Sequence, residues 1–170
     1  LDECATLQLP QRRLLWHYRS LDEALIAFSN YHFYDNALST FPTQDPSDED
    51  LGVRFVYVPD GIYDRGKSRR NPAEARKIVE SVFDHFDKYP EQSLGVVALS
   101  VAQQECILEE IERRRRETPA YEKFFDSGGK EPFFVKNLES VQGDERDVMF
   151  LGIGYGKDIS GRLSLNFGPV

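Results

Sequence analysis

The strongest constraint on the fold is the alternation of short apolar runs with longer segments of helical periodicity. The apolar runs are typical of β-strands and lie at residues 53–58, 94–99, 133–135 and 148–155. Strands that alternate with helices require crossover connections, which place parallel strands side by side in one sheet. We therefore predict an α/β fold with a mainly parallel sheet and helices on both of its faces.

Two of the expected helices have clear start signals. Asn71 suits an N-cap, Pro72 the first helical position and Glu74 the third, and this helix should end before Pro90. Ser100 can cap the next helix. The side chains expected to face the core from that second helix are Val101, Ile107, Leu108 and Ile111.

The two ends of the chain carry weaker signals. Leu21, Ala24, Leu25 and Phe28 recur at helical spacing, which predicts a helix over residues 20–33 with one buried stripe. A last short strand is expected to include residues 163–165. The start at Leu1 without a methionine indicates a fragment.

Composition excludes several classes of protein. The 170 residues, 40% of them hydrophobic and 29% charged, fit one globular domain that covers residues 1–170, with no second domain. No apolar run approaches the roughly 20 residues of a membrane helix. Cys4 and Cys106 lack metal-ligand spacing, as do the three histidines, so we expect no metal site. The net charge of −8 argues against a self-sufficient nucleic-acid module.

The most informative segment is the polar turn between the third and fourth strands. It reads Gln142-Gly143-x-Glu145-x-Asp147 and follows Glu139-Ser140. It resembles motif V of superfamily 1 DNA/RNA helicases, in the branch typified by the nonsense-mediated decay helicases. Val141 stands where that family usually has an aromatic residue, and Asn137 where Thr is common. The resemblance implies contacts of Gln142, Gly143 and Glu145 with ATP, and of Asn137 and Ser140 with nucleic acid.

Two further segments resemble motifs of the same family, and they precede the polar turn in the order that this family has. Tyr18-Arg19-Ser20, before a predicted helix, resembles motif IV, which implies adenine stacking by Tyr18 and a catalytic γ-phosphate contact by Arg19. Chemically, an aromatic ring can stack on a base and a guanidinium can hold a phosphate. Residues 95–104 resemble a strand-to-helix segment that faces single-stranded nucleic acid. The implied contacts there are Ser100 and Gln103 or Gln104.

The resemblance implies the second, C-terminal motor domain of such a helicase, with a three-layer αβα RecA-like (P-loop NTPase-like) fold. No Gly-x-x-x-x-Gly-Lys-Ser/Thr occurs in the chain, and it ends before the position of motif VI. The expected substrate is ATP with Mg²⁺, which the absent first RecA-like domain would mainly hold. The expected partners are that domain and single-stranded nucleic acid, with DNA favoured over RNA, and no membrane. The expected location is a bacterial cytoplasm. Alone, the chain should hydrolyse ATP negligibly.

Two other functions remain open on the residues. A non-catalytic RecA-like binding module is one, with partner contacts through the charged stretches at residues 60–70 and 113–116. A nuclease is the other, but the chain shows no Asp…Glu-x-Lys arrangement on adjoining strands. ATPase activity of a longer protein, with and without single-stranded DNA, would separate these functions from the motor.

Overall fold

The computed structural model describes residues 14–20, 22–42 and 51–163. The chain divides into two compact units, Leu1–Val56 and Tyr57–Val170, which we describe separately. The prediction of one domain over residues 1–170 therefore stays a prediction. Among the described residues, no helix combines the length and the apolar character that a membrane span requires.

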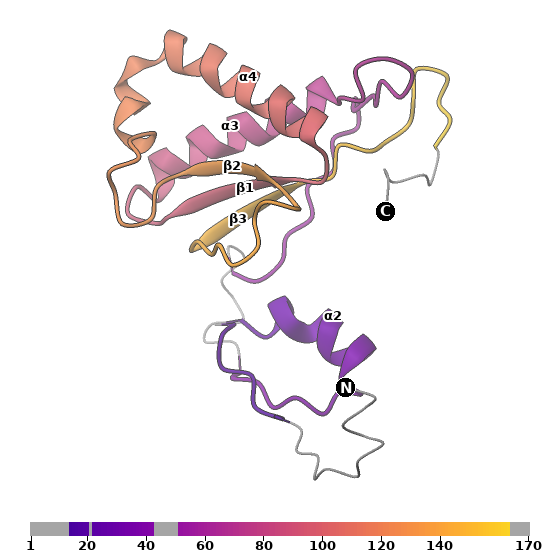
Figure 1. The fold of residues 1–170 in the computed structure, drawn as a ribbon, viewed down its shortest axis with the longest axis vertical. Coiled ribbons are helices and arrows are strands. Elements are labelled where there is room, and N and C mark those ends of the chain that lie inside the picture. Colours follow the sequence, from indigo (N-terminus) through magenta and orange to yellow (C-terminus); the bar gives the residue numbers. More distant parts are fainter. Residues whose placement is uncertain (1–13, 21, 43–50, 164–170) are drawn as a thin grey trace. The chain divides into compact units, whose positions relative to one another are not determined.

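The second unit is built on a parallel sheet of three strands (Figure 1). The strands are β1 (Leu94–Ala98), β2 (Phe134–Asn137) and β3 (Val148–Gly152), in the spatial order β2-β1-β3. Every residue of the central strand β1 is buried, as its continuous apolar sequence predicts. The parallel pairing and the flanking helices confirm the predicted α/β, RecA-like fold class.

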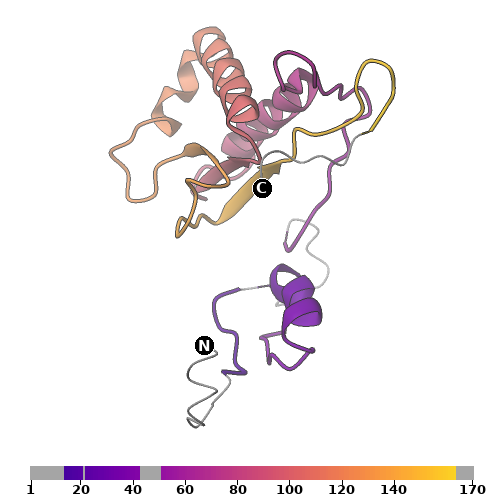
Figure 2. The ribbon, with the colours of Figure 1, turned by 45° about the vertical axis from the view of Figure 1, so that its right-hand side comes forward.

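Both long helices begin where the cap residues predict. Helix α3 (Pro72–Lys88) is capped by Asn71, whose side chain accepts a hydrogen bond from the backbone N–H of Glu74. Helix α4 (Val101–Glu117) is capped by Ser100 in the same way, through the N–H of Gln103. A 3₁₀ helix, η1 (Pro119–Phe124), follows. Figures 1 and 2 show α3 and α4 together on one face of the sheet.

The core lies between these helices and that face. Leu94, Val96 and Ala98 point from β1 towards buried side chains of α3 and α4. Aromatic rings of α3 and η1, with Phe133 before β2, close one end of the core, and Phe86 stacks on Phe124 with ring centroids 4.4 Å apart. The buried hydrophobic side chains of the two helices are Ala75, Val79, Val82, Phe83, Phe86, Cys106, Ile107 and Ile111.

The inward face of α4 differs from the prediction. Ile107 and Ile111 are buried, but Val101 is 52% exposed and Leu108 is 40% exposed. The buried stripe instead begins at Gln103, which lies four residues before Ile107 and eight before Ile111. A helix has one face towards the core, and the polar Gln103 lies on it because its amide is bonded inside the protein.

The opposite face of the sheet carries a second, smaller set of contacts. A Cβ at Gly95 would lie 2.6 Å from Cζ of Phe134 and 2.8 Å from the sulfur of Met149. The glycine therefore makes room for the Phe134 ring. Lys136 and Arg146 lie over this ring, 5.0 and 4.7 Å from its centroid, in the geometry of cation–π contacts.

Two predictions outside this sheet are wrong. Residues 53–58 form no strand with any described residue, because β-propensity alone cannot supply a neighbouring strand for their backbone groups.

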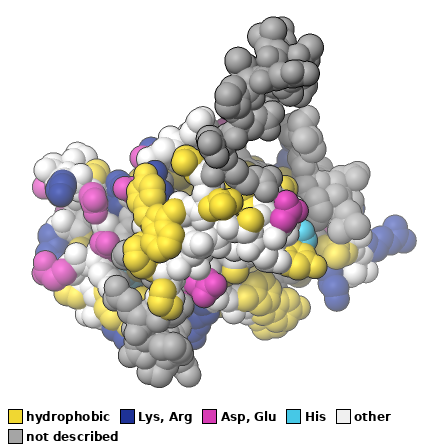
Figure 3. Space-filling model, turned by 90° about the horizontal axis from the view of Figure 1, so that it is seen from below, with side chains coloured by type: hydrophobic (Ala, Val, Ile, Leu, Met, Phe, Trp, Pro, Cys, Tyr) yellow, Lys and Arg dark blue, Asp and Glu magenta, His cyan; other side chains and the backbone are white. Residues whose placement is uncertain are grey.

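The N-terminal unit contains helix α2 (Ala24–Phe33), as expected, but none of its residues is buried. Leu25 and Phe28 are 53% and 67% exposed, and Leu21 lies outside the described residues. Figure 3 shows hydrophobic side chains at the surface. Of the expected last strand, residue 163 is not in a strand, and the rest lies outside the described residues.

A buried pair of polar residues joins the starts of α3 and α4. The side-chain oxygen of Gln103 accepts a hydrogen bond from the backbone N–H of Asn71 at 2.7 Å. The side-chain nitrogen of Gln103 donates to the carbonyl of Asn71 at 3.1 Å. Gln103 is 0% exposed and Asn71 is 4% exposed. We call this pair the Gln103–Asn71 clip.

Replacement of Gln103 by Leu should destabilise the fold strongly. Leu is similar in size but leaves the buried N–H of Asn71 without a partner, while its C=O keeps the bond from the N–H of Ala75. The free energy of unfolding should therefore fall by about 1–3 kcal/mol. Urea unfolding followed by circular dichroism measures this change. The control is Gln92→Ala, at an exposed position, where a change within about 0.5 kcal/mol is expected. Equal effects of the two substitutions would contradict the role of the clip.

Candidate functional site

The carboxyl ends of the three strands meet at one edge of the sheet. Ala98 at the end of β1 is in register with Asn137 of β2 and Gly152 of β3. The N–H of Leu138 donates to the carbonyl of Ala98 at 3.0 Å, and the N–H of Leu99 donates to the carbonyl of Gly152 at 3.0 Å. The segments that follow the strands therefore start side by side, where ligands bind in open α/β sheets.

The turn after β2, residues 138–147, holds four of the predicted contact residues, and we call it the β2–β3 turn. Its first part is folded by Asn137, whose side-chain oxygen accepts a hydrogen bond from the N–H of Ser140 at 2.9 Å. The Ser140 hydroxyl donates to the carbonyl of Asn137 at 3.2 Å. The structure thus brings Asn137 and Ser140 together, with Ser140 exposed.

Three interactions anchor the other end of this turn. Lys136 forms an ion pair with Asp144 at 2.5 Å. The guanidinium of Arg146 donates to the carbonyl of Pro132 at 2.7 and 3.1 Å. The carboxylate of Asp147 accepts hydrogen bonds from the N–H and hydroxyl of Ser93, both at 2.8 Å. These bonds from Ser93 lower the pKa of Asp147.

The anchored turn presents the predicted nucleotide contacts to solvent. Gln142, Gly143 and Glu145 are all exposed. Gly143 has a φ of 87°, in the left-handed region that favours glycine. Nothing lies within 4 Å of the place where a Cβ would be. The backbone conformation, rather than a close neighbour, therefore requires glycine here.

The residues after β1 that were predicted to contact nucleic acid differ in their exposure and hydrogen bonds. Ser100 is half-buried at the edge of the sheet, and its hydroxyl oxygen accepts the capping bond from Gln103 at 3.2 Å. Gln103 does not fit the predicted contact with a nucleic-acid strand, because its side chain is fully buried and both ends of its amide bond to Asn71. The alternative, Gln104, donates to the carbonyl of Val135 at 3.0 Å.

Tyr18 and Arg19 belong to the other unit of the chain. Tyr18 is 75% exposed, and Arg19 is exposed as well. Beside them, the ring of His17 bonds to the hydroxyl of Ser20 at 2.8 Å and accepts its backbone N–H at 3.1 Å. The surface position suits a ring that stacks on a base, but the joint site of these residues with the β2–β3 turn stays a prediction.

Glu74 is a residue of this edge that sequence reasoning assigned only to a helix start. Its two carboxylate oxygens lie 2.8 and 2.9 Å from the backbone nitrogen of Gly154, which donates to them from the segment after β3. Burial raises the pKa of Glu74, and hydrogen bonds from the backbone of Gly154 and Ile153 oppose that rise. The sequence signal for Glu74 is local, whereas its partner lies 80 residues further along the chain.

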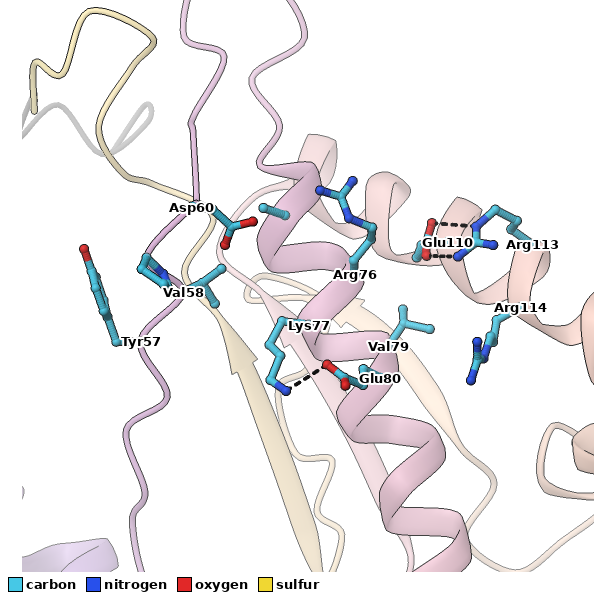
Figure 4. Close-up of a pocket in the computed structure, with 12 residues that line it drawn as sticks. Tyr57, Val58, Asp60, Arg76, Lys77, Val79, Glu80, Glu110, Arg113 and Arg114 are labelled. Carbon is cyan, nitrogen blue, oxygen red and sulfur yellow. Dashed lines mark hydrogen bonds and ion pairs between the residues drawn. The ribbon is translucent and has the colours of Figure 1, made fainter.

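A separate hollow lies along the outer side of α3 and α4 (Figure 4). It has a volume of about 480 Å³ and is lined by both helices and by residues 57–60. Two ion pairs stand in it, Lys77 with Glu80 and Arg113 with Glu110. None of the predicted site residues lines it. Within the described ranges, no group of three or more His, Cys, Asp or Glu side chains is arranged to hold a metal ion.

Comparison with known families agrees with this geometry. Residues 3–154 match the family described as "AAA domain". The chain belongs to this family. An AAA domain of this kind is a P-loop NTPase-like, helicase-like domain, in accord with the parallel sheet.

Two curated relatives of this AAA domain carry helicase names. The chain is 35% identical over 162 residues to the uncharacterized ATP-dependent helicase MG140 of Mycoplasma genitalium, an alignment that covers 92% of the chain and 14% of that protein. It is 32% identical over 163 residues to the homolog of MG140 in Mycoplasma pneumoniae, with the same coverage of 92% and 14%. The chain thus spans about 14% of the length of these relatives.

The raised pKa of Glu74 predicts a characteristic pH dependence of stability. A carboxyl group whose pKa is higher in the folded state stabilises the fold below its unfolded pKa of roughly 4.3, and this contribution is lost as the pH rises through the folded pKa. The wild-type chain should therefore lose stability relative to Glu74→Gln as the pH rises from about 4 towards 7. Urea unfolding of both proteins across this range measures the difference, in which other titrating groups cancel. A difference that does not change with pH would contradict the prediction.

Proposed function

We propose that this AAA domain is the C-terminal motor domain of a superfamily 1 helicase that couples ATP hydrolysis to movement on single-stranded nucleic acid. The observation that carries the proposal is the β2–β3 turn. The turn leaves the carboxyl edge of the parallel sheet at Asn137, is anchored at the start of β3 by Arg146 and Asp147, and exposes Gln142, Gly143 and Glu145 of its Gln-Gly-x-Glu-x-Asp sequence. The helicase names of the two relatives support the same function.

In this proposal the chain forms one wall of an ATP cleft. Tyr18 stacks on the adenine, Arg19 contacts the γ-phosphate, and Glu145 accepts a hydrogen bond from the ribose. Gln142 and Gly143 line the turn beside it. Mg²⁺ is held mainly by a P-loop domain elsewhere in the protein, since phosphoryl transfer depends on metal and donors assembled around the same phosphate.

The same edge supplies part of the track for the nucleic acid. Ser100, Asn137 and Ser140 lie at the ends of adjacent strands β1 and β2 and carry hydroxyl and amide groups suited to sugar and phosphate. The net charge of −8 implies weak binding by this domain alone. We favour DNA over RNA as the strand, in a bacterial cytoplasm. ATP closes the cleft between two RecA-like domains and hydrolysis reopens it, which gives stepwise movement.

Replacement of Arg19 by Ala tests the motor. The experiment uses the longer protein that includes the P-loop domain, and it measures ATP hydrolysis with and without single-stranded DNA. Loss of an arginine that stabilises charge in the transition state should lower kcat by about 10³-fold or more. The matched control is Arg116→Ala, at an exposed position in the last turn of α4, where kcat should be unchanged.

The outcomes separate the motor from a binding module. The proposal requires that DNA stimulates hydrolysis in the unsubstituted longer protein and that the 170-residue chain alone hydrolyses ATP negligibly. A folded longer protein without ATPase activity would support a non-catalytic binding module instead. Normal activity of Arg19→Ala would remove Arg19 from the site but leave the rest of the motor in place.

A further inference from the structure

Two loops beside the candidate site form one structural element. The N–H of Tyr63 donates to the carbonyl of Lys157 at 2.9 Å, and the rings of Tyr63 and Tyr155 lie 5.3 Å apart. Figures 1 and 2 both show the loop before α3 running beside the segment that follows β3. We call residues 61–69 and 155–162 together the basic lobe.

The lobe carries five basic side chains that form no close ion pair with a described residue. The exposed side chains are Arg65, Lys67, Arg69, Lys157 and Arg162. None of them forms an ion pair or a side-chain hydrogen bond with another residue in the described part of the chain. Arg70, directly after the lobe, differs in that it pairs with Glu105 and Glu109 of α4, each at 2.8 Å.

The carboxylates of the lobe are engaged in its own turns. Asp64 accepts hydrogen bonds from the N–H and hydroxyl of Ser68 at 3.0 and 2.8 Å. Asp158 accepts from the N–H and hydroxyl of Ser160 at 2.9 and 2.6 Å, and from the N–H of Arg162 at 3.0 Å. These hydrogen bonds lower the pKa of both carboxyl groups. Both aspartates act in the turns of the lobe, in which the five basic side chains outnumber the two carboxylates.

The lobe lies at the same edge of the sheet as the candidate site. Residues 155–162 follow the end of β3, and residues 61–69 lead into α3, whose Glu74 binds the N–H of Gly154. Because β2 and β3 flank β1, the lobe and the start of the β2–β3 turn at Asn137 and Ser140 lie on either side of Ser100. Adjacent strands are spaced about 4.8 Å apart, so the ends of β2 and β3 are separated by about 10 Å.

We propose that the basic lobe binds the sugar-phosphate backbone of single-stranded nucleic acid and extends the track from the β2–β3 turn across Ser100. This inference rests on the proposed function, because it assumes a strand at this edge. Cations without carboxylate partners release counterions from phosphates and bind them without regard to base sequence. The arginines add a planar fork that matches a phosphate group. The lobe also explains how a chain with net charge −8 holds an anionic polymer locally.

A triple substitution in the longer protein tests the lobe. Arg65→Ala, Lys67→Ala and Lys157→Ala are combined, and Arg69 is left in place because its φ of 55° makes substitution there a backbone change as well. Binding to labelled oligothymidine and oligouridine of about 20 nucleotides is titrated at several salt concentrations. The control combines Arg116→Ala, Lys123→Ala and Lys130→Ala, which remove the same charge from exposed positions outside the lobe. Thermal unfolding checks that both variants are folded.

The lobe variant should bind roughly tenfold more weakly at low salt, and the slope of log K against log[salt] should become shallower by about 2, or 0.7 for each lost phosphate contact. The control should keep its affinity within about twofold and keep its slope. If the unsubstituted protein binds and the lobe variant matches it in affinity and slope, the inference is overturned while the motor remains. If the unsubstituted protein binds neither oligonucleotide, the proposed track and the inference fall together. A preference for one of the two oligonucleotides identifies DNA or RNA as the strand.

Discussion

The Gln103–Asn71 clip is the contact on which the arrangement of the candidate site depends. An amide buried without partners would be costly, so the two hydrogen bonds to Asn71 fix where α4 begins relative to α3. Glu74 of α3 connects a third segment to this contact, because its carboxylate accepts a hydrogen bond from the N–H of Gly154, which follows β3. A Cβ on Gly154 would lie 3.1 Å from Cγ of Gln103, so these segments are also in close contact. Together these contacts make the carboxyl edge of the sheet a single polar framework.

The distribution of ion pairs separates structural charge from charge that is open to a ligand. The run of arginines at residues 113–116 is the densest basic segment of the sequence, yet Arg113 pairs with Glu110 and Glu117, and Arg115 pairs with Glu112 and Glu122. These contacts join α4 to itself and to η1, as expected for the charged face of a solvated helix. The cations of the basic lobe are more widely spaced in the sequence but lack such partners among the described residues. The density of basic residues in the sequence therefore overstates the charge that residues 113–116 can offer to a ligand, and understates the charge that the basic lobe can offer.

The parts of the fold that were predictable from sequence are those with a local cause. The caps at Asn71 and Ser100 and the buried strand β1 follow from neighbouring residues, and all three were predicted correctly. The failures have non-local causes. Residues 53–58 have strand propensity without a partner among the described residues, and no periodicity reveals that Gln103 binds the backbone of Asn71, 32 residues away. The β2–β3 turn was found because its chemistry is contiguous, whereas Glu74 was missed as a site residue because Gly154 is distant in sequence.

The β2–β3 turn has a mechanical consequence for the proposed motor. The residues proposed to contact the strand, Asn137 and Ser140, and the residue proposed to contact the nucleotide, Glu145, belong to one short segment. This segment is hydrogen-bonded at its start and anchored at its end by Lys136, Arg146 and Asp147. A segment fixed in this way moves as one body with the sheet. A shift of Glu145 when the ATP cleft closes therefore carries Asn137 and Ser140 by the same displacement. Coupling between nucleotide and strand in this domain then requires only rigidity across a few residues, and no change of conformation within the turn.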